Sequence, residues 1–112
     1  MFDVEIKSWL FDILQSISEI EGYFDENYIF EMYVNDIKTK RAVERDLEII
    51  GEAVNRIIKK EPDFPLSNAY QIIGTRNRII HGYDAISDDL IWSILEVNIP
   101  QLKKEVSDII GV

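Results

Sequence analysis

The residues best suited to chemistry lie close together in segment 76–83, which contains the chain's only histidine. Arg76 lies five residues before His81, Asn77 lies four before it, and Tyr83 lies two after it. A guanidinium binds phosphate, an imidazole transfers protons near neutral pH, and an amide and a phenol form hydrogen bonds. A lone histidine near a helix end is more often structural than catalytic, but these neighbours favour a reactive site.

This combination suits the cleavage of RNA by its own 2′-hydroxyl group. A base removes the 2′-OH proton, an acid protonates the leaving 5′-oxygen, and a cation stabilises the charge that develops on the phosphate. One imidazole per chain supplies only one of the two proton transfers. A twofold homodimer that places two copies of His81 and Arg76 side by side would supply both, so the chemistry predicts a homodimer.

Other catalytic motifs are missing from the sequence. A single histidine excludes an HExxH motif, and the nearby carboxylates Asp84 and Asp88 are too few for a metal site. The chain has no cysteine, and its five glycines form no Walker A loop, G-x-S-x-G elbow or G-x-G-x-x-G turn. We therefore expect neither a metal ion nor a cofactor.

A second polar feature precedes this segment. Charged residues recur at steps of four, three and four: Arg41, Arg45, Glu48 and Glu52. One interpretation is a solvated helix face with weak ion pairs. The other is that one of the arginines contacts RNA phosphate, or that the glutamates orient Arg76 and His81. Arg78, opposite Ile79 and Ile80, which we expect to be buried, is either solvated or a phosphate contact.

Charge is distributed unevenly along the 112 residues, whose net charge is −9. Residues 1–36 carry −8, residues 37–60 carry +3, and the remainder carries −4. This balance argues against a protein that coats nucleic acids, and no DNA partner is expected. RNA contact would have to be local, at a basic patch built around residues 38–45 and 76–78, or a partner would have to help.

Nothing in the sequence indicates a membrane protein. No apolar run approaches the roughly 18 residues that span a bilayer. The acidic N-terminal segment lacks the basic and apolar regions of a signal peptide. We expect a soluble cytoplasmic protein with no membrane partner.

Apolar residues recur at alternating steps of four and three, which is the spacing of one face of an amphipathic helix. The first stripe consists of Ile6, Leu10, Ile13, Ile17, Ile20 and Phe24. The others consist of Val43, Leu47, Ile50, Val54 and Ile57, and of Leu95, Ile99, Leu102, Val106 and Ile109. Trp9 and Trp92 neighbour these stripes, so we expect both to pack in the core or an interface rather than to stack on bases.

Glycines, prolines and capping residues predict where the helices end. Gly22 ends the first helix, residues 25–36 form a short helix or turn, and Pro62 and Pro65 stop a long helix over 36–60. Ser67 caps a third helix that ends near Gly82, Ser87 caps another, and Pro100 kinks the last. Long helices with short connections predict an all-α, antiparallel four-helix bundle with a short extra helix, forming one domain over 1–112.

At these residues the sequence resembles a known family. The motif Arg76-x4-His81-x-Tyr83 is similar to the signature of HepT-like toxins, members of the HEPN superfamily. Segment 41–53, with its Arg-Ala-Val-Glu-Arg and Ile-Gly-Glu-Ala stretches, resembles the family's other recurring segment, and the region from Trp92 to Pro100-x-Leu102 also fits. The resemblance spans nearly the whole chain, and the short histidine motif is specific because it stands in register with segment 41–53.

The resemblance implies a dimeric helical bundle with a composite ribonuclease cleft, in which Arg76 and His81 are catalytic and Asn77 gives polar support. It also implies a type VII-like toxin–antitoxin system, whose partner is a minimal nucleotidyltransferase acting as antitoxin. In characterised relatives this partner transfers AMP to the motif tyrosine, here Tyr83. The added phosphate would repel RNA and occupy the guanidinium.

Two other functions fit the same residues. The chain could be a non-catalytic helical module that binds or presents a nucleotide for the partner transferase, with Arg76 and His81 holding a phosphate. It could also be a purely structural helical dimer in which the motif is a polar cluster at an interface.

Overall fold

The computed structural model describes residues 3–24, 28–82 and 86–112, and the described chain is almost entirely helical. The elements in order are α1 (Val4–Phe24), α2 (Phe30–Val34), α3 (Ile37–Lys60), α4 (Ala69–His81), α5 (Asp88–Ser93), the π-helical turn η1 (Ile94–Asn98) and α6 (Ile99–Ile110). No strand occurs within these ranges. The predicted all-α fold is therefore confirmed.

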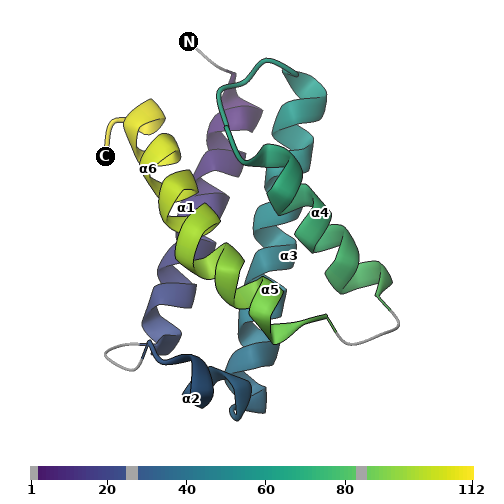
Figure 1. The fold of residues 1–112 in the computed structure, drawn as a ribbon. Helices are drawn as coiled ribbons and strands as arrows, with labels where there is room; N and C mark the ends of the chain where they lie inside the picture. The colour runs from purple at the N-terminus through teal and green to yellow at the C-terminus, as the bar shows by residue number, and fades with distance from the viewer. Residues whose placement is uncertain (1–2, 25–27, 83–85) are drawn as a thin grey trace.

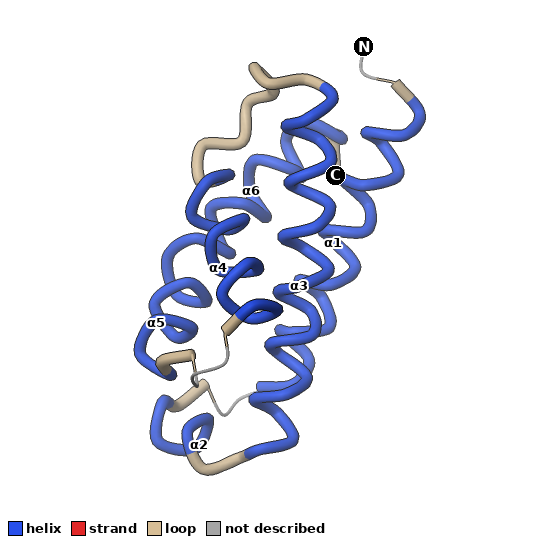
Figure 2. The backbone as a smooth tube through the Cα atoms, turned by 90° about the vertical axis from the view of Figure 1, so that its right-hand side faces the viewer, coloured by secondary structure: helices blue, strands red, loops and turns tan. Residues whose placement is uncertain are grey.

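The long helices run up and down as an antiparallel bundle (Figure 1). Helix α3 lies in the middle and contacts both α1 and α4, while α1 also contacts α6. Helices α5 and α6, joined by η1, form one bent rod that returns beside α1, and the short α2 closes the end of the bundle (Figures 1 and 2). None of the described helices is long and apolar enough to cross a bilayer.

The predicted apolar stripes form the core. Every residue of the first two stripes is buried, and so is every residue of the last stripe except Ile109, which is partly buried. Trp92 packs among Phe24, Tyr28 and Tyr33, with a ring-centroid distance of 4.3 Å to Tyr28. The expectation that Trp92 serves packing is confirmed.

A buried polar contact also joins α1 to α3. Asp46 is 1% exposed, and the Tyr23 hydroxyl donates a hydrogen bond of 2.6 Å to its carboxylate. This bond raises the pKa of Tyr23 to about 12, and burial raises the pKa of Asp46. The contact satisfies a carboxylate that would otherwise be costly to bury.

Two predicted helix ends are wrong for tertiary reasons. Helix α1 continues through Gly22 to Phe24, because the Phe24 ring is buried against the aromatic cluster and its packing outweighs the weak helix propensity of glycine. Ser67 does not cap α4, whose first flanking residue is Asn68. Instead, the Ser67 N–H and hydroxyl both donate to the Glu105 carboxylate on α6.

Other predicted ends are confirmed. The Asp36 side chain accepts from the Thr39 N–H at the start of α3, and the Ser87 side chain accepts from the Leu90 N–H at the start of α5. The disturbance expected at Pro100 takes the form of the π-helical turn, in which the Ile99 N–H donates to the Ile94 carbonyl. Proline has no N–H to continue the regular bonding pattern, so the preceding turn widens.

The crossing of α3 and α4 depends on Gly51, which is buried. A Cβ atom at this position would lie 2.2 Å from the Cβ of Arg76 and 2.8 Å from its Cγ. Only a glycine lets the stem of Arg76 lie directly against the α3 backbone. The position of Arg76 is therefore set by the closest approach of the two helices.

We predict that Gly51→Ala lowers the free energy of unfolding by about 1–3 kcal/mol, because the added methyl group forces α4 away from α3. The matched control is Gly74→Ala on α4, where a Cβ meets nothing within 4 Å. This control should raise stability by roughly 0.5–1 kcal/mol through helix propensity. Urea denaturation measures both, and equal effects of the two substitutions would contradict the close packing.

Candidate functional site

Arg76 is fixed at the junction of α3 and α4. Its side chain is 22% exposed, and its Nη2 atom donates to Oε2 of Glu52 at 2.5 Å. Its Nη1 atom donates to Oδ1 of Asn77 at 2.8 Å. Two acceptors thus hold the guanidinium plane, and the residue expected to give polar support, Asn77, does contact Arg76.

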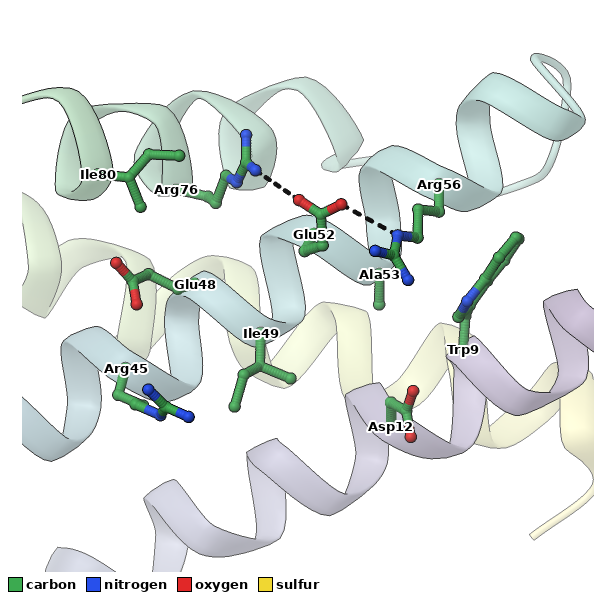
Figure 3. A pocket seen from close by; sticks show the side chains of 10 residues that line it. All are labelled: Trp9, Asp12, Arg45, Glu48, Ile49, Glu52, Ala53, Arg56, Arg76 and Ile80. Carbon is green, nitrogen blue, oxygen red and sulfur yellow. Dashed lines mark hydrogen bonds and ion pairs between the residues drawn. The ribbon is translucent and has the colours of Figure 1, made fainter.

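Glu52 is shared between two cations. Its second oxygen, Oε1, accepts from Nε of Arg56 at 3.0 Å, so that one carboxylate lies between two guanidiniums (Figure 3). Glu52 is therefore in contact with Arg76, as one interpretation of the sequence proposed. The trio carries a net charge of +1. Because its members are partly exposed, each ion pair contributes at most about 1 kcal/mol, and its main effect is to orient Arg76.

A pocket of about 360 Å³ lies between α1, α3 and α4, with Arg76 in its wall (Figure 3). Its lining consists of Trp9, Asp12, Arg45, Glu48, Ile49, Glu52, Ala53, Arg56, Arg76 and Ile80. Trp9 and Asp12 come from α1, Arg76 and Ile80 come from α4, and the others come from α3. Three arginines and three carboxylates balance one another, on a chain whose total charge is −9.

His81 lies apart from Arg76 within one chain. It is the last residue of α4, its side chain is exposed, and it does not line the pocket. Five positions on an α-helix correspond to about 140° around the axis, so Arg76 faces α3 while His81 points elsewhere. Asn77 and His81 are both exposed, as residues four apart on one face should be. Tyr83 lies outside the described residues.

The expectation that Ile79 and Ile80 are both buried is wrong. Ile79 is half-buried, and Ile80 is 41% exposed at the edge of the pocket. The reason is that Ile80 lies on the side of α4 that faces the open pocket, where no helix covers it. The apolar spacing of α4 indicated a core face, but half of that face is open.

The charged face of α3 divides into a solvated part and a pocket part. Arg41 is exposed and forms an ion pair of 3.2 Å with Glu44, the solvated alternative. Arg45 and Glu48 line the pocket with Glu52. Across the described ranges Arg45 forms no ion pair, and neither does the exposed Arg78.

Among the charged and aromatic residues of the pocket, three were not predicted from the sequence: Trp9, Asp12 and Arg56. Arg56 lies four residues after Glu52, so extending the charged face by one helical turn would have found it. Trp9 and Asp12 lie three residues apart on α1, and no sequence signal connects them to Arg76. Within the described parts of the chain no three potential metal-binding side chains gather.

Comparison with known proteins agrees with the motif and the fold. Residues 13–109 match the family described as Ribonuclease HepT-like. A protein of Methanocaldococcus jannaschii named "Putative RNase" is 36% identical over 110 residues, which cover 95% of this chain and 88% of that protein. The "Probable ribonuclease HepT" of Thermococcus cleftensis is 35% identical over 101 residues, covering 87% and 88%.

A third relative, from Caldanaerobacter subterraneus and also named as an RNase, is 38% identical over 85 residues, covering 72% of this chain and 73% of that protein. No solved structure gives a significant match. The family match spans most of the chain and includes α3, with its charged face, and α4, with Arg76 and His81. The chain therefore belongs to the HepT-like ribonuclease family.

Proposed function

We propose that the chain is a metal-independent endoribonuclease of the cytoplasm, the toxin of a type VII-like toxin–antitoxin system. In this proposal Arg76 and His81 cleave RNA in a composite site at the interface of a homodimer. The observation that carries it is the Arg76 guanidinium, held in a pocket wall by Glu52 and Asn77, in a member of a ribonuclease family. A cation fixed before the substrate arrives is what stabilises a charged transition state.

The chemistry assigns one role to each group. Arg76 binds the scissile phosphate through N–H groups that Glu52 and Asn77 leave available, since a guanidinium has five donors. One His81 imidazole removes the 2′-hydroxyl proton, and the 2′-oxygen attacks phosphorus. The partner's His81 protonates the leaving 5′-oxygen, so that a 2′,3′-cyclic phosphate and a 5′-hydroxyl form.

The proposed homodimer follows from the position of His81. The histidine is exposed at the end of α4 and follows Ile80, which is exposed and lines the pocket together with the exposed Ile49. A second copy packed on this end of the pocket would cover both isoleucines and bring two histidines together. Arg45 and Glu48 flank this end. In a twofold dimer, the arginine of each protomer can form an ion pair with the glutamate of the other.

The proposed antitoxin is a minimal nucleotidyltransferase that transfers AMP to Tyr83. Tyr83 is two residues beyond His81 in the sequence, so a nucleotide attached to it would lie near the imidazole. Its phosphate would compete with RNA for positive charge at the site. Modification of one residue would thus block both binding and proton transfer.

We predict that the purified dimer cuts single-stranded RNA in the presence of EDTA. Arg76→Ala and His81→Ala should each lower the cleavage rate by about 100-fold or more, because Arg76 stabilises the charge that develops on the phosphate and His81 transfers a proton. The matched control is Lys104→Ala, which removes an exposed cation paired with Asp108 far from the pocket. Intact RNA with the wild type, or cleavage by both variants at the wild-type rate, would overturn the nuclease and favour a non-catalytic nucleotide-binding module.

Mixed dimers test the composite site. Dimers with one wild-type and one His81→Ala protomer, purified through two different tags, should have nearly the activity of the fully substituted dimer, because one remaining imidazole supplies one proton transfer. Initial rates of cleavage measure this, and mixed dimers of wild type with Lys104→Ala should keep full activity. Half the wild-type rate in the His81 mixed dimer would mean that each protomer works alone.

Co-expression with the nucleotidyltransferase should raise the intact mass of the chain by one or more AMP units and abolish RNA cleavage. Tyr83→Phe should remove the increase. The matched control is Tyr70→Phe, because Tyr70 is 81% exposed on α4 and offers an accessible phenol outside the motif. An increase that persists in Tyr83→Phe but disappears in Tyr70→Phe would show that Tyr70, and not Tyr83, accepts the AMP.

A further inference from the structure

The pocket that Arg76 lines extends away from His81 to a second group of side chains. At this end lie Trp9 and Asp12 of α1 and Arg56 of α3 (Figure 3). The cleavage chemistry uses none of the three. We propose that this end of the pocket binds one unstacked nucleotide of the RNA strand next to the scissile phosphate, with Trp9 stacking on its base and Arg56 binding its phosphate. This inference rests on the proposed function, whose substrate it narrows to single-stranded RNA.

Trp9 is only partly buried and contributes to the surface of the pocket. Its ring is half-buried, packs against the core cluster and lines the pocket. The Lys60 ammonium lies over the ring at 5.9 Å from its centroid. Lys60 itself is held by ion pairs with Asp3 and Glu5 at the start of α1, so the ring has a fixed neighbour. An anchored, partly open indole is a surface on which a base can stack.

Arg56 has donors available for a phosphate. Its Nε atom donates to Glu52, while within the described chain its two terminal nitrogens donate to no side chain. Those terminal nitrogens form the part of a guanidinium that binds two phosphate oxygens at once. The Glu52 carboxylate pairs with both Arg56 and Arg76. The two guanidiniums that we propose to bind phosphate therefore lie on the same wall of the pocket.

The distribution of charge in the pocket determines which way a bound nucleotide would be oriented. The α3–α4 wall carries Arg56 and Arg76, which keep a net charge of +1 together with the Glu52 carboxylate that they share, whereas the α1 wall carries the Asp12 carboxylate beside Trp9. A carboxylate repels phosphate but accepts hydrogen bonds from the amino group of a base or from a ribose hydroxyl. We therefore place phosphate at the arginines and the base at Trp9 and Asp12. The volume of about 360 Å³ lies within the range of small-ligand pockets.

A base can reach Trp9 only if it is unpaired. In an RNA duplex the bases are stacked on one another, and the faces that an aromatic side chain would contact are covered. Stacking on an indole also tolerates any base, so the pocket selects strand state more than sequence. The dimer is expected to cover the Ile80 end, which leaves the Trp9 end open to the strand.

Binding is measured on the intact dimer in EDTA, with a fluorescein-labelled RNA of about eight nucleotides that carries 2′-O-methyl groups and so cannot be cut. Trp9→Leu and Arg56→Gln should each weaken binding at least about fivefold, the lower end of what one stacked base contributes. Arg56→Gln should also reduce the slope of log affinity against log salt by about one. The controls are Lys59→Gln on α3 and Phe11→Leu on α1, which are exposed and do not line the pocket.

A second readout covers the case in which Trp9→Leu does not fold. Strand binding should quench the wild-type tryptophan fluorescence, and Trp9→Phe should abolish this quenching while keeping most of the affinity, because a phenyl ring still stacks. Unchanged quenching in Trp9→Phe, or unchanged affinity in folded Trp9→Leu, would overturn the subsite. If the wild type nevertheless cuts RNA, the proposed nuclease activity stands without the subsite. If the variants lose binding but the wild type cuts no RNA, the subsite stands and the nuclease activity is rejected.

Discussion

The approach of α3 to α4 at Gly51 is the constraint on which the site depends. Because no side chain stands between the two backbones, the stem of Arg76 lies directly on α3. Its guanidinium then meets the next residue of α3, Glu52, and the next residue of its own helix, Asn77. Two adjacent residues of α3 therefore set both the position and the orientation of the cation, so the group proposed to bind phosphate is fixed before a substrate arrives.

The same arrangement explains how an acidic chain can present positive charge. Glu52 holds Arg56 and Arg76 together, although two guanidiniums repel each other, and leaves the trio with a net charge of +1. The pocket lining contains only three of the chain's 21 acidic residues, namely Asp12, Glu48 and Glu52. An RNA strand would therefore meet positive charge at this trio, which favours local contact over coating of the acidic surface.

Local sequence patterns predicted the features that depend on neighbouring residues alone, namely the buried helix faces and the capped helix starts. The four-and-three spacing predicted the buried stripes of α1, α3 and α6, and the cap at Ser87 predicted the start of α5. The errors at Gly22, Ser67 and Ile80 each arose from a partner or an opening that only the folded chain defines. The site followed the same division, because Glu52 reached Arg76 as its spacing suggested, whereas Trp9 joined the pocket through the packing of α1 on α3.

The geometry also adds a reason for the proposed dimer that the sequence alone did not contain. One imidazole per chain supplies only one of the two proton transfers that cleavage needs. In the folded chain, Arg76 faces α3 while His81 ends α4 about 140° further around the axis, so one copy does not direct both at the same phosphate. A second copy placed on the exposed end of α4 would bring its own His81 toward the Arg76 pocket. The same contact between protomers would then supply both the second imidazole and a histidine that faces the same phosphate as Arg76.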